Sequence, residues 1–297
     1  MNTNTAHFGR QVHVYFWKTV RIANREKFWK SLIFAGIISF LVMLVVRNKM
    51  FEEYPATKSG FFTISSACIW IGIFNTIQNV CKEHEIIHAD ARAGMSISAY
   101  VISNALWQMI LCFLEAVIIY GVSLIFIPYD NGTDDVLVFG RLVENFVTVY
   151  LLLFGSACLG LMVSSVANNG TMAMVIMPFV LILQLIFCGV LFELKGGAAV
   201  IGLFTLSRWG MSAFGAVADL NGIAKNANAP TRDFNDGLEQ FRRIKPELKE
   251  IKEPFKIETF YEHESGTVLL AWLCLLVLTL VSVIGTIVIL KMRNKES

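Results

Sequence analysis

The chain has 297 residues, of which 55% are hydrophobic and only 16% are charged, and its net charge is +2. Soluble domains usually contain about 45–50% apolar and ~25% charged residues, so this composition excludes an ordinary water-soluble protein. A charge this close to neutral gives no reason to expect a nucleic-acid partner. The six cysteines lie in or beside apolar stretches without CxxC spacing, so neither a disulfide framework nor a metal site is predicted.

Residues 1–30 are predicted to form an amphipathic helix that lies in the membrane interface. Phe8, Val12 and Tyr15 fall on one face of such a helix, whereas Lys18 and Arg21 fall on another. Basic side chains on the polar face suit contact with anionic lipid. The alternative is a polar lead-in that only sets the topology.

Six apolar stretches are close to or above the roughly 20 residues that cross a bilayer as a helix. If both termini are cytoplasmic, the short inner segments carry eleven lysine and arginine residues and the short outer loops carry four. This bias predicts a multi-pass protein of the cell membrane with both termini in the cytoplasm. We therefore expect an all-α integral membrane protein, with residues 1–297 forming one membrane domain. The six predicted spans are residues 32–46, 61–80, 99–127, 143–163, 172–192 and 268–290.

The connection after the second span, residues 81–97, has the pattern of a short charged helix that ends at Gly94 as its C-cap. Glu83 is followed by Asp90, by Gly94, and then by a Ser-x-Tyr sequence that ends at Tyr100. This succession resembles the coupling-helix region of the type-2 ABC permeases, especially the ABCG subfamily and its bacterial relatives. His84 and His88 are spaced as metal ligands can be, but no third ligand follows at a matching spacing, so no metal is expected.

A second part of the sequence resembles the same family. A Phe-small-Gly-apolar ending closes the fifth span at residues 187–192, and an aromatic-rich segment with Arg208 and Trp209 follows. The order of these motifs covers nearly the whole chain. The resemblance implies a half-transporter with six membrane helices that dimerises on two ATPase domains and exports an amphipathic or lipid-like substrate.

The phosphate-binding sequence Gly-x4-Gly-Lys-Ser/Thr is missing from the 297 residues. This chain is therefore expected to be no enzyme and to bind no cofactor, with ATP and Mg on a separate ABC ATP-binding subunit. A second permease chain, the same or related, and membrane lipid are the other expected partners. Residues 81–97 are the expected docking segment for the ATP-binding subunit, and the alternative is that they form a solvated inner loop. The residues that the resemblance implies for coupling to the ATPase are Glu83, Ile86, Ile87, Asp90, Arg92 and Gly94.

Glu115 lies midway along the third apolar stretch, where a charge costs about 2.5–3.5 kcal/mol on the insertion scale. A substrate contact or a proton-linked gate is one interpretation. A hydrogen-bonded carboxyl that holds helices together is the other, and we favour it because type-2 permeases take their energy from ATP.

By the same resemblance, the second and fifth spans line a central substrate cavity between two permease chains. Amides beside aromatic residues suit a greasy ligand with a polar head, although ordinary bonding between helices explains any single amide equally well. The candidates for the cavity are Phe74, Asn75, Gln78, Gln184 and Phe187. Val190 and Leu191 match the apolar plug that closes the cavity outward.

The long loop 193–266 is predicted to be external. Its first part is apolar but is interrupted by Gly202, Gly210 and Gly215, and it contains Arg208. This pattern fits two short re-entrant helices better than a full span.

These features predict the transmembrane permease subunit of an ATP-driven exporter. A secondary transporter is disfavoured because no half of the chain repeats the other. A membrane hydrolase is disfavoured because neither histidines nor paired carboxylates occur within the predicted spans. The alternative that stays open is a non-transporting sensor or immunity subunit that binds a membrane-active peptide.

Overall fold

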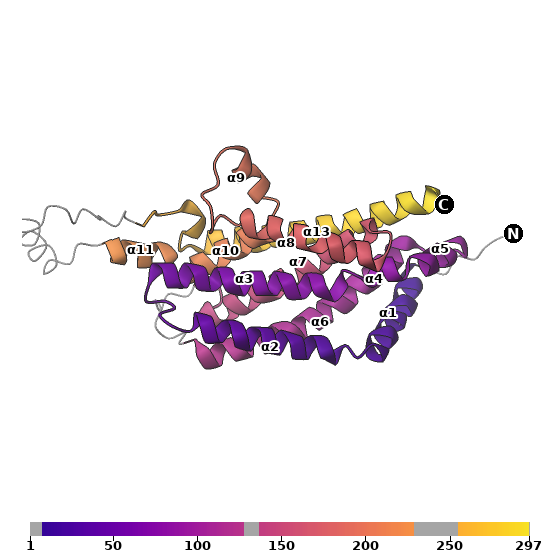
Figure 1. The fold of residues 1–297 in the computed structure, drawn as a ribbon, viewed down its shortest axis with the longest axis horizontal. Coiled ribbons are helices and arrows are strands. Elements are labelled where there is room, and N and C mark those ends of the chain that lie inside the picture. Colours follow the sequence, from indigo (N-terminus) through magenta and orange to yellow (C-terminus); the bar gives the residue numbers. More distant parts are fainter. Residues whose placement is uncertain (1–7, 128–136, 229–254, 297) are drawn as a thin grey trace, which may run out of the picture.

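The computed structural model describes residues 8–127, 137–228 and 255–296, and every regular element within these ranges is a helix. The prediction of an all-α protein is confirmed for this part of the chain. The long helices run side by side along the longest axis of the molecule, while α1, α5 and the C-terminus share one end (Figure 1). The elements are α1 (Phe8–Arg25), α2 (Trp29–Val46), α3 (Tyr54–Thr76), α4 (Asn79–Lys82), α5 (His84–Arg92), α6 (Ile97–Phe126), α7 (Arg141–Val166), α8 (Gly170–Ile186), α9 (Gly197–Gly202), α10 (Leu206–Val217), α11 (Leu220–Asn228), η2 (Thr259–Tyr261) and α13 (Ser265–Glu296).

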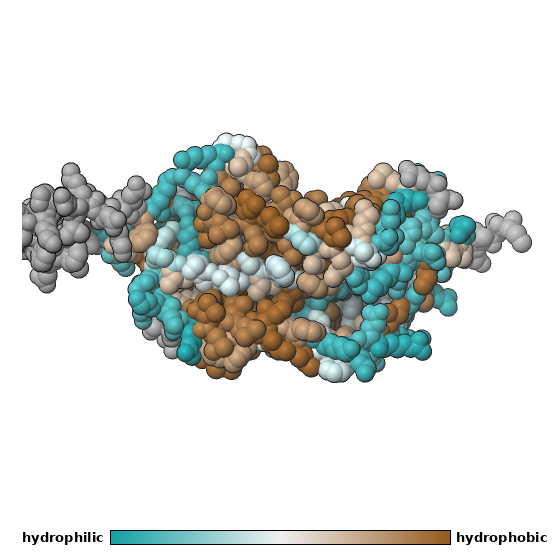
Figure 2. Space-filling model, in the orientation of Figure 1, coloured by the Kyte–Doolittle hydropathy of each residue, from teal (hydrophilic) through white to brown (hydrophobic). Residues whose placement is uncertain are grey.

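Five helical segments in the described residues are long and apolar enough to cross a membrane. They correspond to the predicted first, second, third, fourth and sixth spans. Figure 2 shows hydrophobic side chains over the middle of the molecule and hydrophilic ones gathered at its two ends, as expected for a protein surrounded by a bilayer. The five segments are Trp29–Val46, Tyr54–Lys82, Ile97–Phe126, Arg141–Val166 and Ser265–Lys295.

The prediction of one helix over residues 172–192 is wrong at its C-terminal end. Helix α8 ends at Ile186 after 17 residues, and it contains Pro178. Gly189 then adopts a φ of +83°, a left-handed conformation that glycine tolerates and that turns the chain out of the helix. This sixth apolar helix is therefore shorter than the other five.

The centre of the fold is the contact between α3 and α7, which depends on small residues. A Cβ added at Gly72 would lie 2.0 Å from Ser156 Oγ, and one added at Gly160 would lie 2.2 Å from Thr76 Oγ1. Thr76 Oγ1 also donates to the carbonyl of Ala157 at 2.7 Å. Small residues let the two backbones approach closely, which is how helices associate where apolar surface gives no net driving force.

Helices at both ends of the molecule fix the remaining geometry. Helix α1 packs on α6, where Ser103 Oγ donates to the carbonyl of Val12 at 2.9 Å. After α8, the region predicted to be re-entrant forms two short helices, α9 and α10. Helix α10 packs against α3, α7 and α13, and all its residues except Arg208 are buried. Residues 229–254 of the predicted external loop lie outside the described part of the chain.

Candidate functional site

Helix α5 lies at the end of the molecule that also holds α1 and the C-terminus (Figure 1). Its boundaries follow from local sequence. Glu83 separates it from the single turn α4, and the helix ends at Arg92. Gly94 has a φ of +101°, and the amide of Met95 donates to the carbonyl of Asp90 at 3.0 Å. This is the glycine-terminated ending that the sequence indicates.

One face of α5 is attached to the rest of the molecule. Ile87 is 3% exposed and packs in a cluster with Val80, Tyr100, Leu161 and Leu290, which come from α4, α6, α7 and α13. The buried side chain of α5 is therefore part of an apolar cluster to which three of the long helices also contribute.

Polar contacts complete this attachment. Glu83 Oε2 accepts a hydrogen bond of 2.8 Å from the Tyr100 hydroxyl. Asp90 Oδ2 lies 3.3 Å from Lys18 Nζ and 3.4 Å from the Tyr15 hydroxyl, so α5 is also tied to α1. Burial, and then the nearby Asp90 carboxylate, raise the pKa of Tyr15. Together these contacts fix the orientation of α5 relative to α1 and α6.

The opposite face of α5 is open. Ile86 is 49% exposed, and the side chains of Glu85 and Arg92 are exposed as well. The six predicted coupling residues therefore fall into two groups. Glu83, Ile87 and Asp90 contact other parts of this chain, while Ile86, Arg92 and Gly94 face outward.

His84 and His88 lie beside each other on α5, with their Nε2 atoms 3.2 Å apart. His88 Nδ1 also contacts Asn294 Oδ1 at 2.8 Å, which joins α5 to the end of α13. Burial, followed by the positive charges of Arg293 and His88, lowers the pKa of His84. Across the described residues, no group of three His, Cys, Asp or Glu side chains is placed to hold a metal ion.

Sequence reasoning missed Arg293. Its Nη1 donates to the carbonyls of Ser165 at 2.8 Å and Ala167 at 3.1 Å, and its Nη2 donates to Asn168 Oδ1 at 2.7 Å. It therefore joins the end of α13 to the connection between α7 and α8. The sequence shows only a basic residue after an apolar span, which is also the common signal for topology.

A cavity of 580 Å³ opens between α2, α3 and α6 on the α5 side of the membrane domain. Phe74 and Asn75 line it, as two of the five predicted cavity residues. Gln78 and Phe187 do not line it, and Gln184 is buried, with its side-chain oxygen accepting from the amide of Ser207 at 3.2 Å. The five candidates therefore do not share one cavity.

Glu115 is fully buried and lies where α2, α3 and α6 meet. Asn75 Nδ2 donates to both of its carboxylate oxygens, at 2.9 and 2.8 Å. Ser31 Oγ lies 2.6 Å from Glu115 Oε1 and 2.6 Å from Asn75 Oδ1. Three helices therefore share one polar network, as expected if the carboxyl holds helices together.

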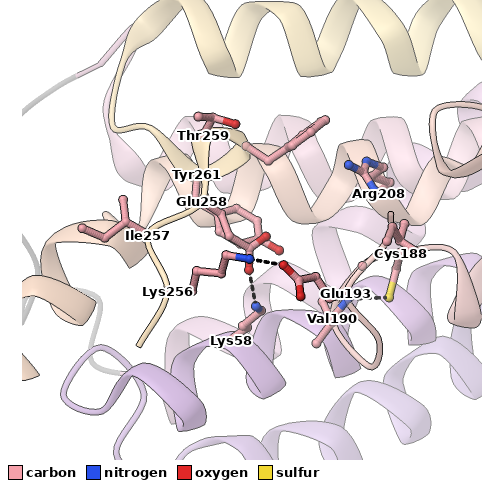
Figure 3. A pocket seen from close by; sticks show the side chains of 13 residues that line it. Lys58, Cys188, Val190, Glu193, Arg208, Lys256, Ile257, Glu258, Thr259 and Tyr261 are labelled. Carbon is pink, nitrogen blue, oxygen red and sulfur yellow. Dashed lines mark hydrogen bonds and ion pairs between the residues drawn. The ribbon is translucent and has the colours of Figure 1, made fainter. Parts of the chain in front are cut away.

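A second cavity, of 540 Å³, is lined by residues of α3, of the segment after α8, of α10 and of the segment that contains η2 (Figure 3). Lys58 Nζ forms an ion pair of 2.7 Å with Glu258, and the guanidinium of Arg208 lies 4.1 Å from the centre of the Phe260 ring. Of the two predicted gate residues, Val190 lines this cavity, while Leu191 is 53% exposed. Both follow the turn that ends α8.

The comparisons with known proteins agree with this arrangement. The sequence model of the ABC-2 type transporter family matches residues 10–214, more than half of the chain. The chain belongs to this family. It is also 24% identical over 160 residues to an ABC transporter ATP-binding/permease protein of Mycobacterium tuberculosis. That similarity covers 53% of this chain and 18% of the relative's length.

Family membership, together with the five long apolar helices of the described residues, makes this chain a multi-pass membrane protein of the ABC-2 transporter type. The family's membrane domain is a permease and not an ATPase. The resemblance to type-2 ABC permeases, noted from the motifs around Glu83 and Gly189, is confirmed.

Proposed function

We propose that this chain is the permease subunit of an ATP-driven exporter of a hydrophobic or amphipathic substrate, such as a lipid, a peptide or a drug. ATP and Mg would be bound by the partner, and a second permease chain would complete the transport path. In this proposal both termini and α5 lie on the cytoplasmic side, with α9 and α10 on the outer side and α8 as the sixth crossing.

The observation that carries the proposal is the two-sided character of α5. Its inner face is joined to the long helices through Ile87, and its outer face presents Ile86 and Arg92. A partner that binds the outer face and moves on ATP binding would push α5 as a rigid piece. The apolar cluster around Ile87 would pass that movement to α6, α7 and α13.

The lining of the 580 Å³ cavity supports the proposal of a hydrophobic or amphipathic substrate. Aromatic rings of Phe34, Trp70 and Phe74 share its wall with the polar side chains of Ser31 and Asn75. A mostly apolar pocket with a few polar groups suits an amphipathic molecule. In the same proposal Val190 and Leu191, after the end of α8, form the outward gate.

The experiment that tests the proposal is affinity purification of the full chain, with mass spectrometry of the proteins that co-elute. We expect an ABC ATP-binding subunit in a fixed ratio. The double variant Ile86→Glu with Arg92→Glu should reduce its recovery at least tenfold, because both changes are on the open face of α5. The matched control makes the same two kinds of change at exposed residues away from α5, Ile201→Glu with Lys195→Glu, and should retain the partner.

Two results would overturn the proposal. If no ATP-binding protein co-elutes with the unmodified chain, a non-transporting sensor or immunity subunit becomes the better account. If the α5 variant keeps the partner as well as the control does, the docking surface lies elsewhere.

A further inference from the structure

The inner cavity, which is the 580 Å³ cavity between α2, α3 and α6, has one charged, solvent-exposed end and one apolar end. Lys27, Lys30 and Glu26 line it at the corner between α1 and α2, and the exposed lysines outnumber the carboxylate by two to one. Further along, Phe34, Ile38 and the aromatic rings of α3 form the apolar part of the wall, beside Ser31 and Asn75. Such a gradient of polarity matches a molecule with a charged head and an apolar tail.

Two tryptophan residues indicate that the charged end of the cavity lies at the level of the membrane interface. Trp107 lines the cavity and packs edge-to-face against Phe28, with ring centres 5.7 Å apart. Trp29 follows directly and is exposed. Tryptophan side chains concentrate where the hydrocarbon meets the headgroups. The lysines of the corner are thus at headgroup level.

The length of the cavity fits one leaflet. Lys30 and Ile38 both line it and are eight residues apart on α2, about 12 Å along a helix. The hydrocarbon of one leaflet is roughly 15 Å deep, half of the ~30 Å core. The cavity therefore runs from the headgroups on the α5 side towards the middle of the bilayer.

Gln108 provides a separate observation. Its side chain is 2% exposed and lines the cavity, and its Oε1 has no hydrogen-bond partner among the described residues. A buried acceptor without a donor is destabilising, so such groups normally have a partner. Gln108 lines this cavity, so a donor bound in the cavity would need only a small movement of the side chain to reach this oxygen.

From these observations we propose that the cavity binds one anionic glycerophospholipid of the leaflet on the α5 side, with a hydroxyl-bearing headgroup. Lys27 and Lys30 hold the phosphate, and a headgroup hydroxyl donates to Gln108 Oε1. The first part of the acyl chains lies against Phe34, Ile38 and Trp70. The volume of 580 Å³ suits a headgroup and the start of the chains. The cavity is the one that the proposed function assigns to the substrate, but lipid binding there rests on the lining residues and not on transport or its direction.

The test is native mass spectrometry of the purified full chain after titration with phosphatidylglycerol or with phosphatidylcholine of the same acyl chains. We expect one phosphatidylglycerol to be retained per chain, in preference to phosphatidylcholine. Lys27→Gln with Lys30→Gln should weaken retention roughly tenfold or more, since each basic residue near anionic lipid contributes about fivefold. The control Arg21→Gln with Arg25→Gln removes the same charge from α1 outside this cavity and should keep the preference.

Gln108→Leu tests the hydroxyl contact. Phosphatidylmethanol carries the same charge as phosphatidylglycerol without a headgroup hydroxyl, so the unmodified chain should bind it several-fold more weakly. The variant should bind the two alike. Equal retention of phosphatidylglycerol and phosphatidylcholine, or an equal loss in the Arg21 and Arg25 control, would overturn the proposal, as would a second copy of the chain covering the cavity. Equal binding of phosphatidylglycerol and phosphatidylmethanol by the unmodified chain would overturn the role of Gln108.

Discussion

Helices α5 and α10 are both short, but they contact the rest of the molecule in opposite ways. In α5 only Ile87 is buried, and polar contacts orient the rest of one face. In α10 every residue except Arg208 is buried, and packing against α3, α7 and α13 surrounds the helix. Helix α5 is therefore packed on one side only, whereas α10 is enclosed by other helices.

This difference suggests different roles. A helix that is packed on one side only keeps an exposed face to which another protein can bind. A displacement of that helix can be transmitted to the helices on which it packs. A helix enclosed on all sides has no free face and moves only with its neighbours. We expect the exposed face of α5 to bind a partner protein. We expect α10 to stay packed inside the membrane domain.

The largest expected effect comes from truncating Ile87, the one buried side chain of α5. Ile87→Ala leaves a cavity in its cluster and should cost about 2–5 kcal/mol of local stability. Hydrogen exchange of the amides in α5 should rise strongly, while exchange in α3 and α7 stays slow. Ile86→Ala, one residue earlier, is the control and should leave exchange unchanged because that side chain is half exposed. Similar results for both variants would contradict the two-sided description of α5.

A smaller effect is expected from crowding α10. A Cβ added at Gly210 would lie 2.7 Å from the Leu152 side chain, so Gly210→Val should cost about 1–3 kcal/mol. The loss should appear as a lower melting temperature of the whole domain in detergent, since α10 is packed on three long helices. The control is Gly197→Val in α9, where an added Cβ meets no atom within 4 Å. A Gly210→Val protein that melts normally would show that α10 yields more easily than its burial indicates.

The sequence was sufficient to predict most of the membrane helices because lipid imposes a long apolar run on each. The third predicted span, 99–127, differs from the helix Ile97–Phe126 by only two residues at one end and one at the other. The same rule failed after Ile186, where the residues remain apolar although the backbone turns at Gly189. Hydrophobicity alone does not record that turn.

The candidate site was less predictable because an amide in an apolar run does not identify its partner. Asn75 and Gln184 looked alike as cavity residues, yet one contacts Glu115 and the other contacts Ser207. The coupling residues could be named from the resemblance to a family, but which of them face inward depends on α1, α6 and α13. Lys18 and Tyr15, 72 and 75 residues from Asp90, give no local signal of that contact.

The smallest expected effect concerns pH and the attachment of α5 to α13. Burial and the positive charges of Arg293 and His88 lower the pKa of His84, so the folded state favours its neutral form. The stabilisation from a lowered histidine pKa is present above the unfolded value of about 6.5 and is lost as the pH falls through the folded value. Hydrogen exchange in α5, corrected for its intrinsic pH dependence, should therefore rise slightly below about pH 6.5. His84→Gln cannot be protonated and should remove this dependence, whereas an unchanged pH profile in that variant would assign the effect to another group.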